Sequence, residues 1–512
     1  MPSAFSPIPP NQFGTYQASH LLWRAGFGCT WEEAEKLAKL GLAGAIESLV
    51  NLPTAPKTDA PSSCMRPPGE TERELREKVG SLSETQRNKL RQERERDERE
   101  KLVELRFWWL NRMLTTSRPL EEKMTLFWHS HFASAYGDKI RHAYSLWQQN
   151  ETLRRYALSG FDELTQKIVR DPTMLVWLDN ANNVRGHANE NLARELMELF
   201  TLGVGNYTEK DVQESARALT GNHIDRDQWS FVFNSGAHDE GEKTFLGKKG
   251  NFKAEDIVKI ICAQPACPRF ITHKLLEFFV YENPEPALVE EAAALFRKVD
   301  LHVGAFLAAL FQSQIFYSTK AQASVVKSPA MLTVGALKSF RVPVPEKNVV
   351  LDALRLMGQD LFIPPDVNGW LGGMAWINSN MLLIRYNFSN FLLNGVSPDQ
   401  FKTYKKDASA FKRREFVESQ RTSKPIDWSP REQLRQLGAD RKLATGADVV
   451  DYYIREFLGR PVSQELRAEF IAFAETDAAG GKKSFSINDS NFDERVRGLV
   501  HLIMSSPDYQ LC

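Results

Sequence analysis

The sequence predicts a mainly α-helical protein, with a large multi-helix body, a small β-hairpin or sheet insertion near residues 229–247 and a C-terminal helical subdomain. Apolar residues recur at helical spacing through most of the chain, and the connections between these segments are short. Strands do not alternate with helices, as they would in a fold with a parallel sheet. With 512 residues, of which 42% are hydrophobic, the chain is long enough to bury a sizeable core.

The composition changes along the chain predict four regions. Residues 1–16 form an irregular lead, residues 17–395 the main helical domain with its small β element, residues 396–445 a polar linker or insertion, and residues 446–512 the C-terminal helical subdomain. The lead has no basic segment followed by an apolar one, so no signal peptide is visible. We therefore expect the chain to be cytoplasmic, or exported with its leader removed.

Charge and hydropathy exclude two classes of partner. Lys and Arg together number 65, and so do Asp and Glu, which gives a net charge of zero. A protein that binds a nucleic-acid backbone needs a surplus of cations, so no nucleic-acid partner is expected. No run of about 18 apolar residues is present, so no transmembrane segment is expected.

The helical elements have recognisable starts and stops. Thr30 and Glu33 have the spacing of a capping box. A charged stretch over residues 70–104 carries opposite charges four apart, which predicts an exposed helix that continues into the core over residues 105–114. Further helices are expected over residues 120–132, 189–202 and 208–219. Alternating residues at 229–233 and 243–246, with glycines between them, predict one hairpin or small sheet.

The predicted helix over residues 189–202 carries the most informative polar face. Asn191, Glu195 and Glu198 lie at positions i, i+4 and i+7, so they share one side of the helix. Two carboxylates and an amide beside a core face suit acid–base catalysis or metal ligation. They equally suit a buried polar network that holds helices together. Arg194 lies on the neighbouring face, where it would steer an anionic group of the substrate, and Asn191 is the second candidate substrate-binding residue of this helix.

His238 and Asp239 lie in a loop flanked by glycine, and such a pair is suited to acid–base work or to metal binding. His129 and His131 are candidate ligands of a divalent metal, the one cofactor that the sequence brings into consideration. On a regular helix two residues two apart point about 200° apart, so both imidazoles would reach one ion only if the helix has already ended. The alternative is one buried, hydrogen-bonded histidine and one that points outward.

The loop over residues 364–379 combines two tryptophans, two asparagines and three glycines. Flat indoles beside amides suit sugar rings, so Trp370, Trp376 and Asn378 are candidate substrate-binding residues. The alternative is a large loop that its tryptophans pin into the core.

These segments, in this order, resemble the bacterial family DUF1800, a domain of unknown function. The resemblance covers essentially the whole chain and is specific, because many blocks lie in register. The blocks are residues 20–28 (HLLWRAGFG), 127–132 (FWHSHF), 189–203 (NENLARELMELFTLG), 207–212 (YTEKDV), 216–221 (ARALTG), 238–243 (HDEGEK), 367–370 (VNGW) and 376–379 (WINS). The resemblance implies a large, often exported protein, often encoded beside a sulfatase-like family, DUF1501. It implies no reaction.

Two hypotheses for function follow. The first is an enzyme, a hydrolase or lyase that acts on a glycan-like substrate, in which Glu195, Glu198, His238 and Asp239 are catalytic. The second is a non-catalytic binding or assembly protein that works with a sulfatase-like DUF1501 partner. An enzyme needs the polar blocks to line one concave pocket, so the position of Glu195 relative to His238 is the discriminating observation.

Overall fold

The computed structural model describes residues 3–51, 61–65, 72–395, 425–439, 443, 445–476, 481 and 485–512. It is mainly helical, as predicted. From the N-terminus to the middle of the chain the helices are α1 (Thr15–Ala25), α2 (Trp31–Ala38), α3 (Gly41–Val50), α4 (Glu72–Gly80), α5 (Glu84–Thr115), α6 (Pro119–His131), α7 (Ala143–Arg155), α8 (Phe161–Ile168), α9 (Pro172–Trp177), α10 (Asn191–Glu198), α11 (Glu209–Ala218) and α12 (Ala254–Cys262).

The second half continues in the same manner. Its helices are α13 (Ala266–Phe279), α14 (Pro286–Lys298), α15 (Val303–Gln312), α16 (Pro329–Phe340), α17 (Lys347–Leu356), α18 (Ser379–Asn394), α20 (Pro430–Gln436), α21 (Gly446–Leu458), α22 (Gln464–Ala474), α23 (Phe492–Ser505) and α24 (Pro507–Gln510). In the described part of the chain, no helix combines the length and the hydropathy that crossing a membrane requires.

The local signals that start the helices act as expected. Thr30 Oγ1 accepts a hydrogen bond from Glu33 N at 3.2 Å, and Glu33 Oε2 accepts one from Thr30 N at 2.8 Å. Each side chain thus satisfies a backbone N–H that the first turn of α2 leaves without a helical partner. The predicted capping box is confirmed.

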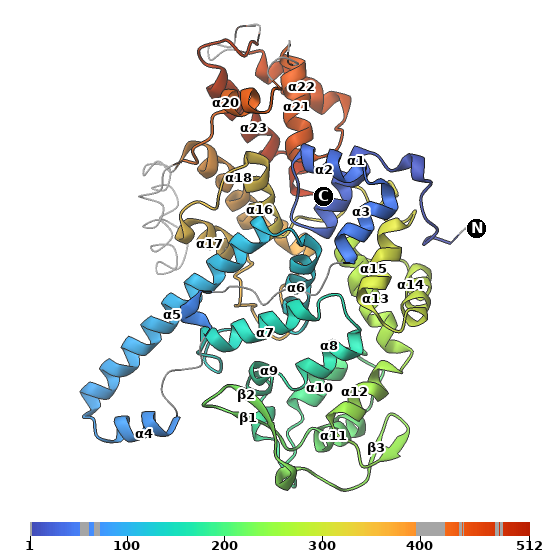
Figure 1. Cartoon of the computed structure of the whole chain (residues 1–512), viewed down its shortest axis with the longest axis vertical. Helices are drawn as coiled ribbons and strands as arrows, with labels where there is room; N and C mark the ends of the chain where they lie inside the picture. Colours follow the sequence, from blue (N-terminus) through green and yellow to red (C-terminus); the bar gives the residue numbers. More distant parts are fainter. Residues whose placement is uncertain are drawn as a thin grey trace.

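The charged stretch forms two helices and not one. Ser83 Oγ caps the start of α5 by accepting from Gln86 N, so the chain breaks after α4. The expected ladder is present on α5, where Arg91 and Lys101 pair with Glu95 and Asp97 at 3.0 and 2.7 Å. Figure 1 shows α5 projecting from the body with α4 at its far end, while its last turns enter the core.

The β structure consists of two hairpins, whereas the sequence predicted one hairpin or sheet. Strand β1 (Asn222–Asp225) pairs antiparallel with β2 (Ser230–Phe233), and β3 (Lys243–Phe245) pairs antiparallel with β4 (Lys248–Gly250). Each strand therefore pairs with its nearest neighbour in sequence. Trp229 is not part of β2, because its backbone lies in the left-handed region at φ 47° within the turn.

The C-terminal helices gather at one end of the molecule in Figure 1. Helix α23 packs against α18, and the backbone of Cys512 donates a hydrogen bond to Val325 O at 3.0 Å. The division into a main domain and a C-terminal subdomain stays a prediction. Of the expected linker 396–445, residues 396–424, 440–442 and 444 lie outside the described residues.

Candidate functional site

Helix α10 carries Glu195 and Glu198, and the connection between β2 and β3 carries His238 and Asp239, the other two residues predicted to be catalytic. The apolar face of α10 is fully buried at Leu192 and Leu196, which turns its opposite face outward. The connection to α11 contains Gly203, whose φ of 79° favours glycine. Thr208 then starts α11 with a capping box to Asp211. The connection with Gly203 and Thr208 thus brings α10 and α11 into contact.

Glu195 is the candidate whose carboxyl group is least engaged. The residue is partly buried, and among the described residues its carboxyl group takes part in no hydrogen bond or ion pair. Burial raises the pKa of Glu195, and the neighbouring carboxylate of Glu198 raises it further, while Arg194 opposes this change. The Glu195 carboxyl is therefore more readily protonated than an ordinary glutamate.

Glu198 lies one turn further along α10 in different surroundings. Its Oε2 accepts a hydrogen bond from the Tyr207 hydroxyl at 2.9 Å. Burial and the Glu198 carboxylate raise the pKa of Tyr207 to about 12, so the phenol keeps its proton and remains the donor. The two carboxyls of this face thus differ, because one has a fixed hydrogen-bond donor and the other has none.

The candidate substrate-binding residues of α10 are engaged by their own protein. Arg194 Nη1 pairs with Glu209 at 2.8 Å, and its Nη2 pairs with Glu190 at 3.0 Å. Asn191 Nδ2 donates to Asp179 Oδ2 at 3.1 Å. An anionic substrate group would have to displace two carboxylates from Arg194, so the steering role expected from the sequence has little support.

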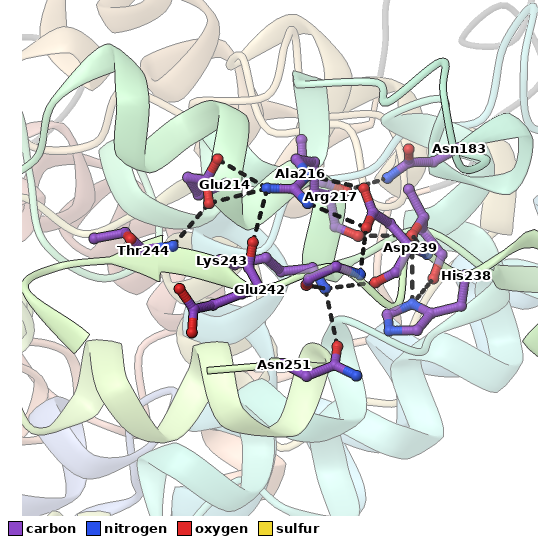
Figure 2. A network of polar contacts seen from close by, with 12 residues as sticks. Asn183, Glu214, Ala216, Arg217, His238, Asp239, Glu242, Lys243, Thr244 and Asn251 are labelled. Carbon is purple, nitrogen blue, oxygen red and sulfur yellow. Dashed lines mark hydrogen bonds and ion pairs between the residues drawn. The ribbon is translucent and has the colours of Figure 1, made fainter. Parts of the chain in front are cut away.

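Asp239 belongs to a network of ion pairs and hydrogen bonds with neighbouring residues of the same protein, which Figure 2 shows. Arg217 donates to Asp239 Oδ2 and Oδ1 at 2.8 and 3.1 Å, and it also pairs with Glu214 at 3.0 Å. The Gly241 backbone donates to Asp239 Oδ1 at 2.8 Å. The Arg217 guanidinium holds the pKa of Asp239 down to about 2. Asp239 is therefore ionised and held in place, which does not suit a proton donor.

Lys243, the first residue of β3, extends the same network (Figure 2). Its ammonium is fully buried and donates to the backbone oxygens of Asp239 and Gly241 and to Asn251 Oδ1. Three oxygen acceptors match the three donors of an ammonium group. These internal contacts use all the donors of Lys243 and fix the loop.

His238 is fully buried beside this network. Its Nδ1 donates to Thr220 O at 2.8 Å, which fixes the tautomer, and its Nε2 has no hydrogen-bond partner among the described residues. The Phe233 ring lies 5.4 Å from the imidazole, centroid to centroid. This imidazole carries a lone pair that a general base needs, but solvent does not reach it.

The two polar groups lie at opposite ends of α11. Glu209, the partner of Arg194, is the first residue of the helix, and Arg217, the partner of Asp239, lies in its last turn. These residues are eight positions apart, which corresponds to about 12 Å along a helix axis. This arrangement therefore does not favour the single pocket that would combine Glu195 with His238 and Asp239.

The two histidines of α6 point in different directions, because the helix continues through His131. The His129 ring packs against Trp109, Phe362 and Trp370, with centroid distances of 5.4, 5.3 and 5.6 Å. Neither ring nitrogen has a partner in the described part of the chain. Burial lowers the pKa of His129 to about 3, so the imidazole is neutral.

His131 has partners for both nitrogens. Its Nε2 donates to Phe200 O at 2.9 Å, and its Nδ1 accepts from Lys274 Nζ at 3.3 Å. Burial lowers the pKa of Lys274 to about 8. Within the described residues, no three His, Cys, Asp or Glu side chains come together as metal ligands. The metal role of His129 and His131 thus gains no support.

The loop with the tryptophans is pinned into the body. Trp370 and Trp376 are only 8% and 6% exposed, so neither indole offers an open face to a sugar ring. Trp370 N donates to Ser130 Oγ at 3.1 Å, and Asn378 Oδ1 caps α18 by accepting from Met381 N at 3.1 Å. This geometry is the second alternative that the sequence left open.

The most heavily bonded buried carboxylate is one that sequence reasoning missed. Glu122 is completely buried and accepts from Arg154, from Arg112 and, at 3.0 Å, from Trp109 Nε1. Burial alone would raise its pKa, but the two guanidiniums outweigh that effect and lower it. In the sequence, Glu122 lies within an apolar helical run. A carboxylate that is buried with such a run needs a buried cation as its partner, and this pattern could have pointed to Glu122.

Comparison with known proteins identifies one family. Its sequence profile, described as DUF1800, protein of unknown function, matches residues 20–511. Neither a curated protein nor a solved structure matches the chain.

Proposed function

The chain belongs to the DUF1800 family, whose description names no reaction, and we propose from the site alone that it is a hydrolase or lyase acting on a glycan-like substrate. Glu195 is the residue that exchanges a proton with the substrate. Glu198, with its Tyr207 partner, is the second carboxylate of the site.

One observation carries the proposal. Glu195 is a partly buried carboxyl with a raised pKa and no bonding partner in the described part of the chain, while nearly every other candidate is engaged. A raised pKa places a carboxyl closer to neutral pH, where it can both donate and accept protons efficiently. Two carboxyls in unlike surroundings also suit glycosidic bond cleavage, in which one acts as acid and the other as base or nucleophile.

The chemistry assigns distinct tasks to the two residues. Protonated Glu195 gives its proton to the oxygen of the departing sugar, while Glu198 stabilises the positive charge that develops on the ring or activates the attacking water. The Tyr207 hydroxyl orients the Glu198 carboxyl. In a lyase, ionised Glu195 would instead remove a proton from the substrate.

His238, Asp239 and the α6 histidines have no step in this proposal. Asp239 and Lys243 position the loop that follows β2, and the His238 imidazole supports it through Thr220. A divalent cation has no assigned step either, because the described residues bring no three ligands together.

A polysaccharide screen tests the proposal. Purified wild-type protein is incubated with a panel of plant, fungal and bacterial polysaccharides, and new reducing ends and unsaturated uronates are measured. We expect E195Q to lose activity at least about 100-fold, the usual contribution of a positioned acid–base group. The matched control is E35Q, at an exposed glutamate of α2. Equal activity of E195Q and wild type would contradict the proposal.

A second candidate function is non-catalytic assembly with a protein partner. Leu371 and Met374 are 85% and 64% exposed on the loop that holds Trp370, an unusual position for large apolar side chains. The resemblance suggests a sulfatase-like DUF1501 protein as that partner. Binding of such a protein from the same genome to wild type, weakened by the double variant L371S/M374S, would favour this function.

A further inference from the structure

A pocket lies between the N-terminal lead and the segment that follows α15. Ile8, Pro9, Gln12, Gln17, Gln314 and Tyr317 line it, and its volume is about 360 Å³. Pockets that bind small molecules typically measure about 300–1,000 Å³. None of the six residues belongs to α10 or α11, so the pocket is distinct from the Glu195 face.

Backbone hydrogen bonds hold two walls of the pocket together. Ile8 N donates to Gln312 O at 2.9 Å, and Gln314 N donates to Ser6 O at 2.8 Å. Pro7 and Ser313 form an antiparallel bridge between these two bonds. The pocket thus rests on paired backbone from two segments about 300 residues apart in sequence, and this pairing fixes its shape before any ligand arrives.

The lining is uncharged and rich in amides. Gln17 Oε1 accepts from Gly14 N at 3.1 Å. The carboxamides of Gln12 and Gln314 form no hydrogen bond with any other described residue. Each carboxamide has two donor hydrogens and an acceptor oxygen. The pocket therefore offers both donors and acceptors, with no ionic group.

Tyr317 forms part of the pocket wall. Its ring lies edge-on to Phe13 and Phe316 at 6.2 and 5.0 Å. Its hydroxyl is buried and has no partner among the described residues. Because solvent does not reach this hydroxyl, it is the ring of Tyr317, and not the hydroxyl, that faces the pocket. Burial also raises the pKa of Tyr317, so the hydroxyl stays protonated.

We propose that this pocket is a saccharide subsite, which holds one part of a neutral glycan chain apart from the Glu195 face. Sugar hydroxyls both donate and accept, as carboxamides do. The ring of Tyr317 together with Pro9 and Ile8 supplies apolar surface for the C–H groups of the sugar. A charged ligand would lose its hydration in the pocket and would find no opposite charge there, so the lining favours a neutral ligand. The inference rests on the proposed function for its substrate class.

The test is binding of four neutral hexasaccharides, namely cellohexaose, chitohexaose, maltohexaose and mannohexaose, measured by calorimetry and by ligand-observed NMR. We expect at least one to bind wild type, and the double variant Q12A/Q314A to bind it at least tenfold more weakly. The matched control is Q228A/Q464A, which removes two exposed glutamines elsewhere. Y317F keeps the ring and removes only the buried hydroxyl, so it should bind as wild type does while its melting temperature stays unchanged or rises.

Two results would overturn the subsite. One is that no hexasaccharide binds, or that the double variant binds as tightly as wild type. The other is that hexaalanine, a peptide of similar length, binds the pocket more tightly than any of the sugars. E195Q separates this inference from the proposed function. Wild-type binding by E195Q is expected, and cleavage that does not depend on Glu195 would defeat the catalytic proposal while leaving the subsite in place.

Discussion

Arg217 holds Asp239 with two parallel hydrogen bonds, from Nε to Oδ2 at 2.8 Å and from Nη2 to Oδ1 at 3.1 Å. This bidentate geometry is the strong form of an arginine–carboxylate contact. It joins the end of α11 to the loop before β3 and accounts for a histidine–aspartate pair that looks catalytic in the sequence.

Replacing Asp239 with asparagine should lower the free energy of unfolding by about 1–2 kcal/mol at pH 7. The folded pKa of Asp239, about 2, lies below that of an unfolded aspartate. Its contribution is therefore complete above about pH 4 and is lost as the pH falls toward 2. Urea unfolding at pH 7, 4 and 3 measures both effects. D138N, at a fully exposed aspartate, is the control, and equal stability of D239N and D138N would contradict the prediction.

His129 should make the protein sensitive to mild acid. Its folded pKa of about 3 lies below the value of about 6.5 for an unfolded histidine. The unfolded chain therefore binds the proton first, and stability falls as the pH drops from 6.5 toward 3. H129F removes this titration and two buried nitrogens that have no partner in the described structure.

We expect the unfolding free energy of H129F to depend less on pH than that of wild type between pH 6.5 and 4.5, with equal or higher stability at pH 7. Urea unfolding at three pH values checks this. H187Q, at an exposed histidine, should follow wild type. Parallel pH curves for H129F and wild type would show that His129 is already protonated or exposed in the folded state.

Gly369 is the residue that allows the tryptophan loop to approach α6. A Cβ at this position would lie 2.1 Å from Ser130 O, and the φ of Gly369 is 81°. Gly186 has nearly the same φ, 84°, but a Cβ added there would meet no atom within 4 Å. G186A should therefore cost about 1–2 kcal/mol for its backbone conformation alone.

G369A should cost clearly more than G186A, because the clash with backbone adds to the same φ cost. Thermal unfolding of the two variants measures the difference, and tryptophan fluorescence reports movement of Trp370. Equal melting temperatures would mean that the loop is not packed on α6 as described.

Glu195 and Glu122 should respond oppositely to the same substitution. E195Q removes a charge that has no partner in the described structure, so its unfolding free energy should change by less than about 0.5 kcal/mol. E122Q leaves two arginines without their buried counter-charge and should cost about 3–5 kcal/mol. Parallel urea titrations give both values, and a large loss in E195Q would make Glu195 a structural residue.

Local chemistry made much of the fold predictable. The capping box of Thr30 and Glu33, the ladder of Arg91, Glu95 and Lys101, and the glycine that ends the α10 region each depend on neighbours in sequence. The second hairpin and the left-handed Trp229 were not predictable, because strands of three or four residues carry little periodicity.

The site was less predictable, because the role of each polar side chain depends on which residues it contacts in the folded chain. Arg217 and Asp239 are 22 positions apart, and no local rule pairs them. Arg194 directly precedes Glu195, yet neighbouring residues on a helix do not face each other, and Arg194 pairs with Glu190 and Glu209 instead. Which carboxyl remains available for chemistry is thus a property of the folded chain.

The rate of polysaccharide cleavage per folded molecule of E195Q decides whether Glu195 is the carboxyl that exchanges a proton with the substrate. On the substrate that the screen identifies, the rate should fall at least about 100-fold relative to wild type while the fold, judged by circular dichroism and melting temperature, is unchanged. Cleavage by folded E195Q at the wild-type rate would show that Glu195 has no catalytic role.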